Sequence, residues 1–208
     1  VCWSMSKINW PLYNQKIGMM CLFRKTMKIK LLFTYLVLWC SVTIQAQNTL
    51  NFKNQNLPAT ELWNFVCEEY ALYGTTQLQI AKTSQGGLLK ISMPAHDENA
   101  FIMGNLYLDL ADGATLICTD KGFRENKDNQ MNSFYVFSAA EMNKLQKNNI
   151  LRVRFQIVSK KKKFGNQNGY FTAVNKKAYF STYYATDDKT NPTAQAVKAL
   201  YATSPTAH

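Results

Sequence analysis

The sequence predicts an α+β fold: a single domain of mostly antiparallel β-sheet, with about eight hairpin-connected strands, on which two or three helices pack. Three observations lead to this prediction. Short apolar stretches alternate with polar residues over much of the chain, which is the period of a strand with one buried face. Turn-forming dipeptides separate neighbouring stretches. The regular β-α-β alternation that builds a parallel sheet is absent.

The composition is that of a globular chain with an uneven charge. Of 208 residues, 47% are hydrophobic, 9 are glycine and 5 are proline, which excludes collagen-like, low-complexity and disordered classes. Six of the +11 net charges lie in residues 1–46, which contain no acidic residue, and four form the run Lys160–Lys163. The rest of the chain is almost neutral, so we expect any electrostatic function to be local to that run and its surroundings.

Residues 27–46 have the pattern of a secretory signal peptide. Lys28 and Lys30 form a short cationic head, an apolar run covers residues 31–44, and Ala46 precedes Gln47. The apolar run is shorter than the roughly 20 residues that cross a bilayer as a helix. We therefore expect export to the periplasm or the exterior, cleavage near Ala46–Gln47, and no transmembrane span in the mature chain. The alternative is a buried N-terminal core helix.

The signal peptide divides the chain into three parts. Residues 1–26 are expected to be an upstream extension outside the natural product, or a long N-region of the signal. Residues 27–46 are the signal peptide itself, and residues 47–208 form the single exported α+β domain.

The mature chain begins with a predicted strand and a predicted helix. Leu50 and Phe52 alternate with polar residues, which indicates a strand over residues 48–53. A helix is predicted over residues 59–73, after Pro58 and before Gly74, because four large side chains recur at helical spacing. These are Leu62, Val66, Tyr70 and Tyr73.

Two hairpins are predicted next. Strands around residues 78–80 and 89–93 are joined by residues 84–87, where two glycines allow positive backbone angles. Alternating leucines over residues 105–110 lead through Ala111-Asp112-Gly113 into residues 115–119, and the Asp-Gly pair is a strong hairpin signal.

A polar loop over residues 120–132 is expected to lead into a strand over residues 134–137. Ser138 and Glu141 have the spacing of a capping box. They therefore predict the start of a helix over residues 139–147, which should bury Met142 and Leu145.

The C-terminal part contains the clearest strand pattern of the chain, over residues 151–157. Aromatic strands are predicted near residues 170–174 and 178–184, followed by a short helix over residues 192–201. Aromatic side chains occur on both faces of the second of these strands. One face must therefore be covered by a helix or serve as a contact surface.

The candidate ligand-binding residues centre on the lysine run. Lys160, Lys161, Lys162 and Lys163 precede Phe164 and a turn-prone segment, and Arg152 and Arg154 lie on the polar face of the preceding strand. A basic hairpin beside aromatic residues could hold phosphates, sulfates or carboxylates. The alternative is that the lysines merely protect an exposed strand edge from aggregation.

The two cysteines of the mature chain, Cys67 and Cys118, could form a disulfide in an oxidising compartment or could be buried as small apolar side chains. We expect no metal site and no cofactor, since zinc spacings and the glycine motifs of nucleotide binding are absent. His96-Asp97-Glu98 is the one cluster of histidine and carboxylates, and three adjacent residues rarely converge on one ion.

Three functional hypotheses follow. The leading one is a non-catalytic, exported cell-envelope domain that binds a protein or an anionic glycan through its basic hairpin and aromatic strands. The second is a hydrolase whose carboxylates are brought together only by folding. The third is a nucleic-acid-binding domain, which requires that the export prediction be wrong. The sequence does not predict an oligomeric state.

Overall fold

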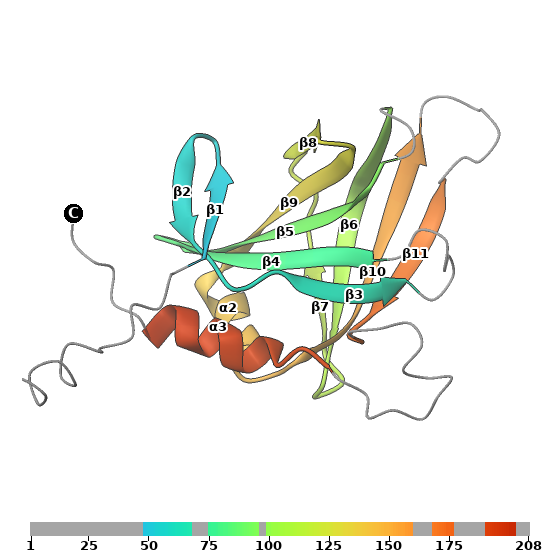
Figure 1. Ribbon diagram of the computed structural model, residues 1–208. Helices are drawn as coiled ribbons and strands as arrows, with labels where there is room; N and C mark the ends of the chain where they lie inside the picture. Colours follow the sequence, from blue (N-terminus) through green and yellow to red (C-terminus); the bar gives the residue numbers. More distant parts are fainter. Residues whose placement is uncertain (1–47, 68–74, 96–98, 160–167, 177–189, 203–208) are drawn as a thin grey trace, which may run out of the picture. The chain divides into compact units, whose positions relative to one another are not determined.

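The computed structural model describes residues 48–67, 75–95, 99–159, 168–176 and 190–202 (Figure 1). All of these residues belong to one compact unit, Gln47–His208. The predictions for His96–Glu98, for the lysine run with Phe164, and for a strand over residues 178–184 lie outside the described residues.

The described residues form eleven strands and two helices. The strands are β1 (Thr49–Phe52), β2 (Gln55–Pro58), β3 (Trp63–Cys67), β4 (Thr75–Thr83), β5 (Gly86–Pro94), β6 (Ala100–Leu110), β7 (Thr115–Cys118), β8 (Arg124–Lys127), β9 (Gln130–Ser138), β10 (Ile150–Ser159) and β11 (Gly169–Val174). The helices are α2 (Ala139–Leu145) and α3 (Thr193–Ala202). This is the predicted α+β class of mostly antiparallel sheet, with more strands than the roughly eight expected.

Nine of the strands form one antiparallel sheet in the order β7-β6-β10-β11-β3-β4-β5-β9-β8, and β1 pairs only with β2. The hairpins β4–β5, β6–β7, β8–β9 and β10–β11 supply half of the neighbouring pairs in this sheet, as expected for local connections. Neither helix in the described part of the chain has the length and apolar character needed to span a membrane.

The sheet curls until β9 approaches β6, and side chains join the two strands. The hydroxyl groups of Ser133 and Tyr135 donate to the carbonyl oxygens of Ile102 and Gly104, at 2.8 Å and 3.1 Å. These carbonyls belong to the half of β6 that lies beyond its pairing with β7. Along the edge of β6 that β7 does not cover, side-chain donors of β9 therefore satisfy these two backbone carbonyls.

The two faces of the sheet carry separate apolar clusters. The inner face forms the main core, to which α2 and α3 contribute Met142, Leu145 and Val197. On the outer face the β1–β2 hairpin covers a smaller cluster that includes Leu88 and Phe134. Figure 1 shows this hairpin and α3 on opposite sides of β4.

Helix α2 begins as predicted. The Ser138 side chain accepts from the Glu141 backbone N–H, and the Glu141 carboxylate accepts from the Ser138 N–H at 2.7 Å, which completes the capping box. Met142 and Leu145 are buried, as expected. A Cβ at Gly87 would lie 2.3 Å from the Met142 sulfur, so glycine allows α2 to lie directly on β5.

The predicted helix over residues 59–73 is wrong where the structure describes it, because residues 63–67 form β3. Its inward side chains Trp63, Phe65 and Cys67 recur every second residue and are fully buried. Trp63 pairs with Leu78 of β4, and Val66 pairs with Val174 of β11. This non-local pairing outweighs the local helical period of the apolar residues.

The predicted loop over residues 120–132 contains strand β8 and the start of β9. Asp128 and Asn129 connect them in a two-residue turn with φ values of 53° and 57°. Such a turn needs positive φ at both positions, and Asp and Asn tolerate it better than most residues. In the 84–87 hairpin, Ser84 and Gln85 make the turn, and both glycines lie in β5.

The hairpin of residues 105–119 is confirmed as β6–β7, with Gly113 at φ +85°. The predicted strands at 151–157 and 170–174 are confirmed as β10 and β11, and the predicted final helix is confirmed as α3.

Candidate functional site

Arg152 and Arg154 project from the outer face of β10. Their neighbours Val153 and Phe155 are buried in the main core, so strand alternation turns both arginines outward. Arg154 pairs with Tyr107 of β6 on one side and with Thr172 of β11 on the other. The predicted polar face of this strand is thus part of a wider surface that spans three strands (Figure 1).

Asp109 of β6 holds both arginines. Its carboxylate lies 2.9 Å from an Arg154 guanidinium nitrogen and 3.6 Å from Nε of Arg152, and it accepts a 2.8 Å hydrogen bond from the Thr115 hydroxyl. The Arg154 guanidinium carbon lies 5.3 Å from the centre of the Tyr107 ring, within cation–π range. Both arginine side chains are exposed, and these neighbours set the orientation of their guanidinium groups.

These contacts lower the pKa of Asp109. Partial burial acts in the opposite direction and is the largest single influence, but it is outweighed by the hydrogen bonds from Arg154 and Thr115 together with the charges of both arginines. Two guanidinium groups share one carboxylate, so this local group retains one net positive charge.

Large apolar side chains are exposed beside the arginines. Ile117 of β7 is opposite Tyr107 and is 55% exposed, and Tyr170 of β11 is opposite Gln156 and is 77% exposed. Together with β7 this surface covers four strands. We call it the arginine face, and define it by Tyr107, Asp109, Ile117, Arg152, Arg154 and Tyr170.

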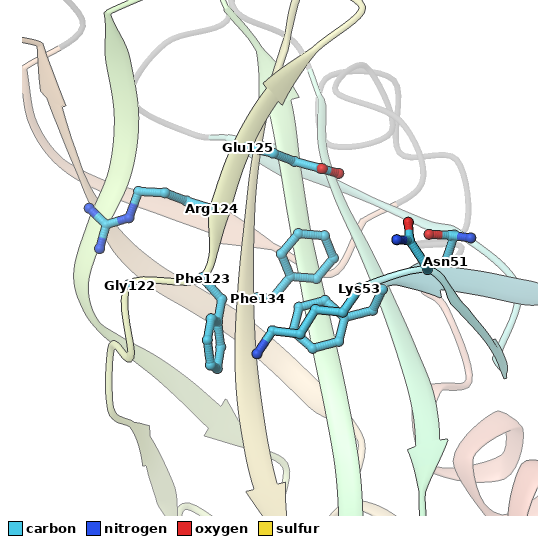
Figure 2. A pocket seen from close by; sticks show the side chains of 9 residues that line it. Asn51, Lys53, Gly122, Phe123, Arg124, Glu125 and Phe134 are labelled. Carbon is cyan, nitrogen blue, oxygen red and sulfur yellow. The ribbon is translucent and has the colours of Figure 1, made fainter.

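A pocket lies elsewhere, between the tip of the β1–β2 hairpin and the segment that leads into β8. It has a volume of about 350 Å³ and its apolar lining consists of Phe52, Phe123 and Phe134 (Figure 2). The Phe52 ring centre lies 5.6 Å from that of Phe123, edge to face, and 4.9 Å from that of Phe134. These distances are typical of packed aromatic pairs.

Polar side chains surround this aromatic lining. Asn51, Lys53 and Asn54 come from the hairpin, whereas Arg124 and Glu125 come from β8. The Lys53 ammonium lies 4.0 Å from the Phe123 ring centre and 5.3 Å from that of Phe52. The sequence patterns do not predict this pocket, because they indicate no strand over residues 55–58 and they place Phe123 in the predicted loop over residues 120–132.

Arg124 forms an ion pair within the protein. Its guanidinium lies 2.7 Å from the Asp120 carboxylate, which also accepts from the N–H groups of Gly104 and Gly122 at 2.8 Å and 2.7 Å. Beside the pocket, Lys90 has a pKa below its ordinary value. Burial causes this shift, Glu125 opposes it, and Lys127 reinforces it.

Cys67 and Cys118 are not joined by a disulfide, which corrects the disulfide alternative. Cys67 lies on β3 and Cys118 on β7, and strands β6, β10 and β11 lie between them in the sheet order. Both side chains are buried in the main core. Burial, followed by the Glu141 charge, raises the pKa of Cys118, which keeps it a thiol.

Among the described residues, no group of three His, Cys, Asp or Glu side chains is arranged to hold a metal ion. Comparison of the chain with known proteins gives no match: no protein-family model, no curated protein and no solved structure is similar to it.

Proposed function

We propose that residues 47–208 are an exported, non-catalytic binding domain of the cell envelope that docks a protein partner on the arginine face. Export is supported by the signal-peptide pattern of residues 27–46. The docking proposal is carried by one observation: Arg154, oriented by Asp109 and Tyr107, lies among exposed large apolar side chains.

The chemistry of this face favours a protein over a glycan. Arginine and tyrosine are enriched at the centres of protein interfaces, where a rigid cation and an aromatic ring supply most of the binding energy. Both arginines already contact Asp109, so an anionic glycan would have to compete with that carboxylate. Ile117 gains little from a polar glycan but can be buried against a protein.

Two of the described carboxylates, Asp109 and Asp120, favour the binding domain over the hydrolase hypothesis. Asp109 is held by two arginines and Asp120 by Arg124 and two backbone N–H groups. A catalytic carboxylate pair needs groups that can contact a substrate, whereas Asp109 and Asp120 are both occupied by donors of the protein itself.

Photo-crosslinking in the native cell envelope tests the proposal. A photoreactive residue at Ile117 should give one dominant protein adduct, whereas the same residue at exposed Lys198 of α3 should not. The purified partner should then bind the Tyr107→Ala and Arg154→Ala variants at least about tenfold more weakly. Lys144→Ala, on the exposed side of α2, should leave the affinity unchanged. Equal binding by all variants would remove the arginine face from the proposal.

Export has its own measurement. The N-terminus of the protein isolated from the envelope should be Gln47, determined by mass spectrometry. An N-terminus at Met27 or upstream of it would contradict export with cleavage while leaving the crosslinking result unaffected.

A further inference from the structure

We propose that the pocket between the β1–β2 hairpin and β8 binds an acidic sugar, a hexose that carries one carboxylate. The pocket does not include any residue of the arginine face. The proposed sugar site and the proposed protein-docking surface can therefore be tested independently of each other.

The size of the pocket fits one sugar unit. Its volume of about 350 Å³ is at the lower end of the roughly 300–1,000 Å³ range of small-molecule sites. It opens at the surface, so a terminal sugar of a longer glycan could enter while the remainder of the glycan stays in solvent.

The aromatic lining supplies the surface on which a sugar ring would lie. Phe134 is 4% exposed and forms the deepest part, whereas Phe52 and Phe123 are half-buried. Hexoses have one face of C–H groups, whose partial positive charge complements the negative face of an aromatic ring. The half-buried rings would lose contact with water when this face covers them, which favours binding.

Lys53 supplies the cation for the carboxylate. Its backbone has a φ of 50°, in the left-handed region that is unfavourable for lysine, at a turn position where glycine or asparagine is preferred. In this conformation its ammonium lies over the Phe123 ring. None of the ion pairs within the described residues involves Lys53. A ligand carboxylate would thus be the first to neutralise it.

The remaining polar groups are suited to sugar hydroxyls. Figure 2 shows Asn51 and Glu125 on one side of Phe134, and the Lys53 ammonium with Phe123 on the other. Asn51 donates to Asn56 at 3.0 Å, so its carbonyl oxygen remains to accept a hydroxyl. Glu125 is a second acceptor for hydroxyl groups.

The distribution of charge limits the class of ligand. Arg124 is held by Asp120, so Lys53 is the pocket's only cation that no described carboxylate pairs with, and Glu125 repels a second anionic group. A polyphosphate or nucleic acid needs several free cations and is disfavoured. A ligand with one carboxylate at the Lys53 end and neutral hydroxyls at the Glu125 end would form an ion pair with Lys53 and donate hydrogen bonds to Glu125.

Titration calorimetry of the mature domain tests the proposal. Sodium galacturonate should bind with a Kd of about 1 mM, as expected for a small ligand in an open site. Galactose lacks the carboxylate and N-acetylglycine lacks the sugar ring, so both should bind at least about tenfold more weakly. A galacturonate trimer that binds as well as the single sugar would show that the pocket accepts a glycan terminus. A single sugar that binds while the trimer does not would overturn the terminal-sugar arrangement and leave the free sugar as ligand.

The decisive variant is Lys53→Gly. Glycine accepts the φ of 50° more readily than lysine, so the midpoint of chemical unfolding should not fall, while galacturonate binding should weaken at least about tenfold. Lys127→Ala is the matched control, because it removes an exposed charge from β8 outside the pocket and should change the affinity less than about twofold. Phe123→Leu should weaken galacturonate and its trimer equally.

Two results would overturn the sugar site. One is the absence of galacturonate binding at about 10 mM, tenfold above the expected Kd. The other is an equal loss in Lys53→Gly and Lys127→Ala, which would show attraction by overall charge alone. Neither result bears on crosslinking at Ile117.

Discussion

The hydroxyl of Tyr135 on β9 donates to the carbonyl oxygen of Gly104 on β6 across 3.1 Å. Burial raises the pKa of Tyr135, and the Asp120 carboxylate nearby adds to the effect. The hydroxyl therefore stays protonated and remains a donor throughout the physiological range. A third side chain contacts the same edge of β6: Asn126 of β8 donates to the Ala100 carbonyl at 2.9 Å. We call these three side-chain contacts with β6 the seam.

Removal of this hydroxyl should loosen the seam. In Tyr135→Phe the partly buried Gly104 carbonyl loses this donor, and the free energy of unfolding should fall by about 1–2 kcal/mol. Urea denaturation measures this loss. Tyr107→Phe is the control, because Tyr107 lies on the outer face and contacts Arg154 through its ring. Its loss of stability should therefore stay within about 0.5 kcal/mol. Equal losses would contradict a role for the seam in stability.

Gly86 should tolerate no side chain. An added Cβ would lie 2.2 Å from the Phe137 carbonyl oxygen and 2.8 Å from the Ser138 carbonyl carbon, both backbone atoms, and its φ is +151°. Gly86→Ala should therefore cost about 3 kcal/mol or more, because the junction of β9 and α2 must move.

Gly113→Ala is the comparison that separates the steric clash at Gly86 from the energetic cost of a positive φ. Gly113 has a φ of +85° and no heavy atom within 4 Å of an added Cβ. Its substitution should cost about 1–2 kcal/mol, the price of a positive φ alone. Thermal or urea unfolding of both variants provides the comparison, and similar losses would show that the close approach at Gly86 is unimportant.

Local patterns predicted those elements whose stability is local. The capping box at Ser138 and Glu141, the Asp112-Gly113 turn and the alternation of β10 each depend on residues within a few positions of one another. The pocket could not be predicted in this way. Phe52, Phe123 and Phe134 converge only because a hairpin far earlier in the chain folds over β9.

Strand β3 shows why a helical spacing of apolar residues can lead to a wrong prediction of secondary structure. Residues 59–67 contain apolar side chains at both two-residue and helical spacings, and the local sequence does not decide between them. Pairing with β4 and β11 decides it, because only a strand buries Trp63, Phe65 and Cys67 together. Those partners begin eight residues further on in β4 and about a hundred residues further on in β11.

The two cysteines should remain unreactive thiols in the native protein. Cys67 and Cys118 are buried, and the raised pKa of Cys118 keeps the reactive thiolate scarce. A thiol reagent such as Ellman's reagent should label neither residue in the native mature domain and both after unfolding in urea. Mass analysis without reductant that showed a disulfide between them would contradict the strand order given above.

Asp109 should make stability depend weakly on pH in acid. Its folded pKa lies below the ordinary 3.8, so its contribution is complete above 3.8 and is lost as pH falls through the folded value. The arginine side chains are 57% and 48% exposed, which limits the contribution to about 1 kcal/mol. The difference in unfolding free energy between the wild type and Asp109→Asn should therefore shrink below pH 3.8. A difference that stays constant with pH would exclude this ion pair as the cause.

Asn175 should be the residue on which the docking of α3 depends. It is 3% exposed, and its side-chain N–H groups donate to the carbonyls of Ile150 and Asn191 at 2.8 Å and 3.0 Å. Its side-chain oxygen accepts from the Asn191 backbone N–H at 2.8 Å and from the Asn191 side chain at 2.9 Å. These bonds fix the chain two residues before α3 begins, where the Thr193 hydroxyl accepts from the Ile150 N–H.

The isosteric change Asn175→Asp tests this arrangement more sharply than truncation. It keeps the shape of the side chain but directs a carboxylate oxygen at two carbonyl oxygens, so we expect a loss of about 3 kcal/mol or more at neutral pH. Protonation would restore one donor, so the loss should be smaller near pH 4. Trypsin cleavage after Lys198 should be faster in this variant, because α3 leaves the sheet more often. Asn143→Asp on exposed α2 should change neither quantity measurably. Equal cleavage rates in the two variants would mean that the apolar contacts of Val197 and Leu200 hold α3 without the asparagine network.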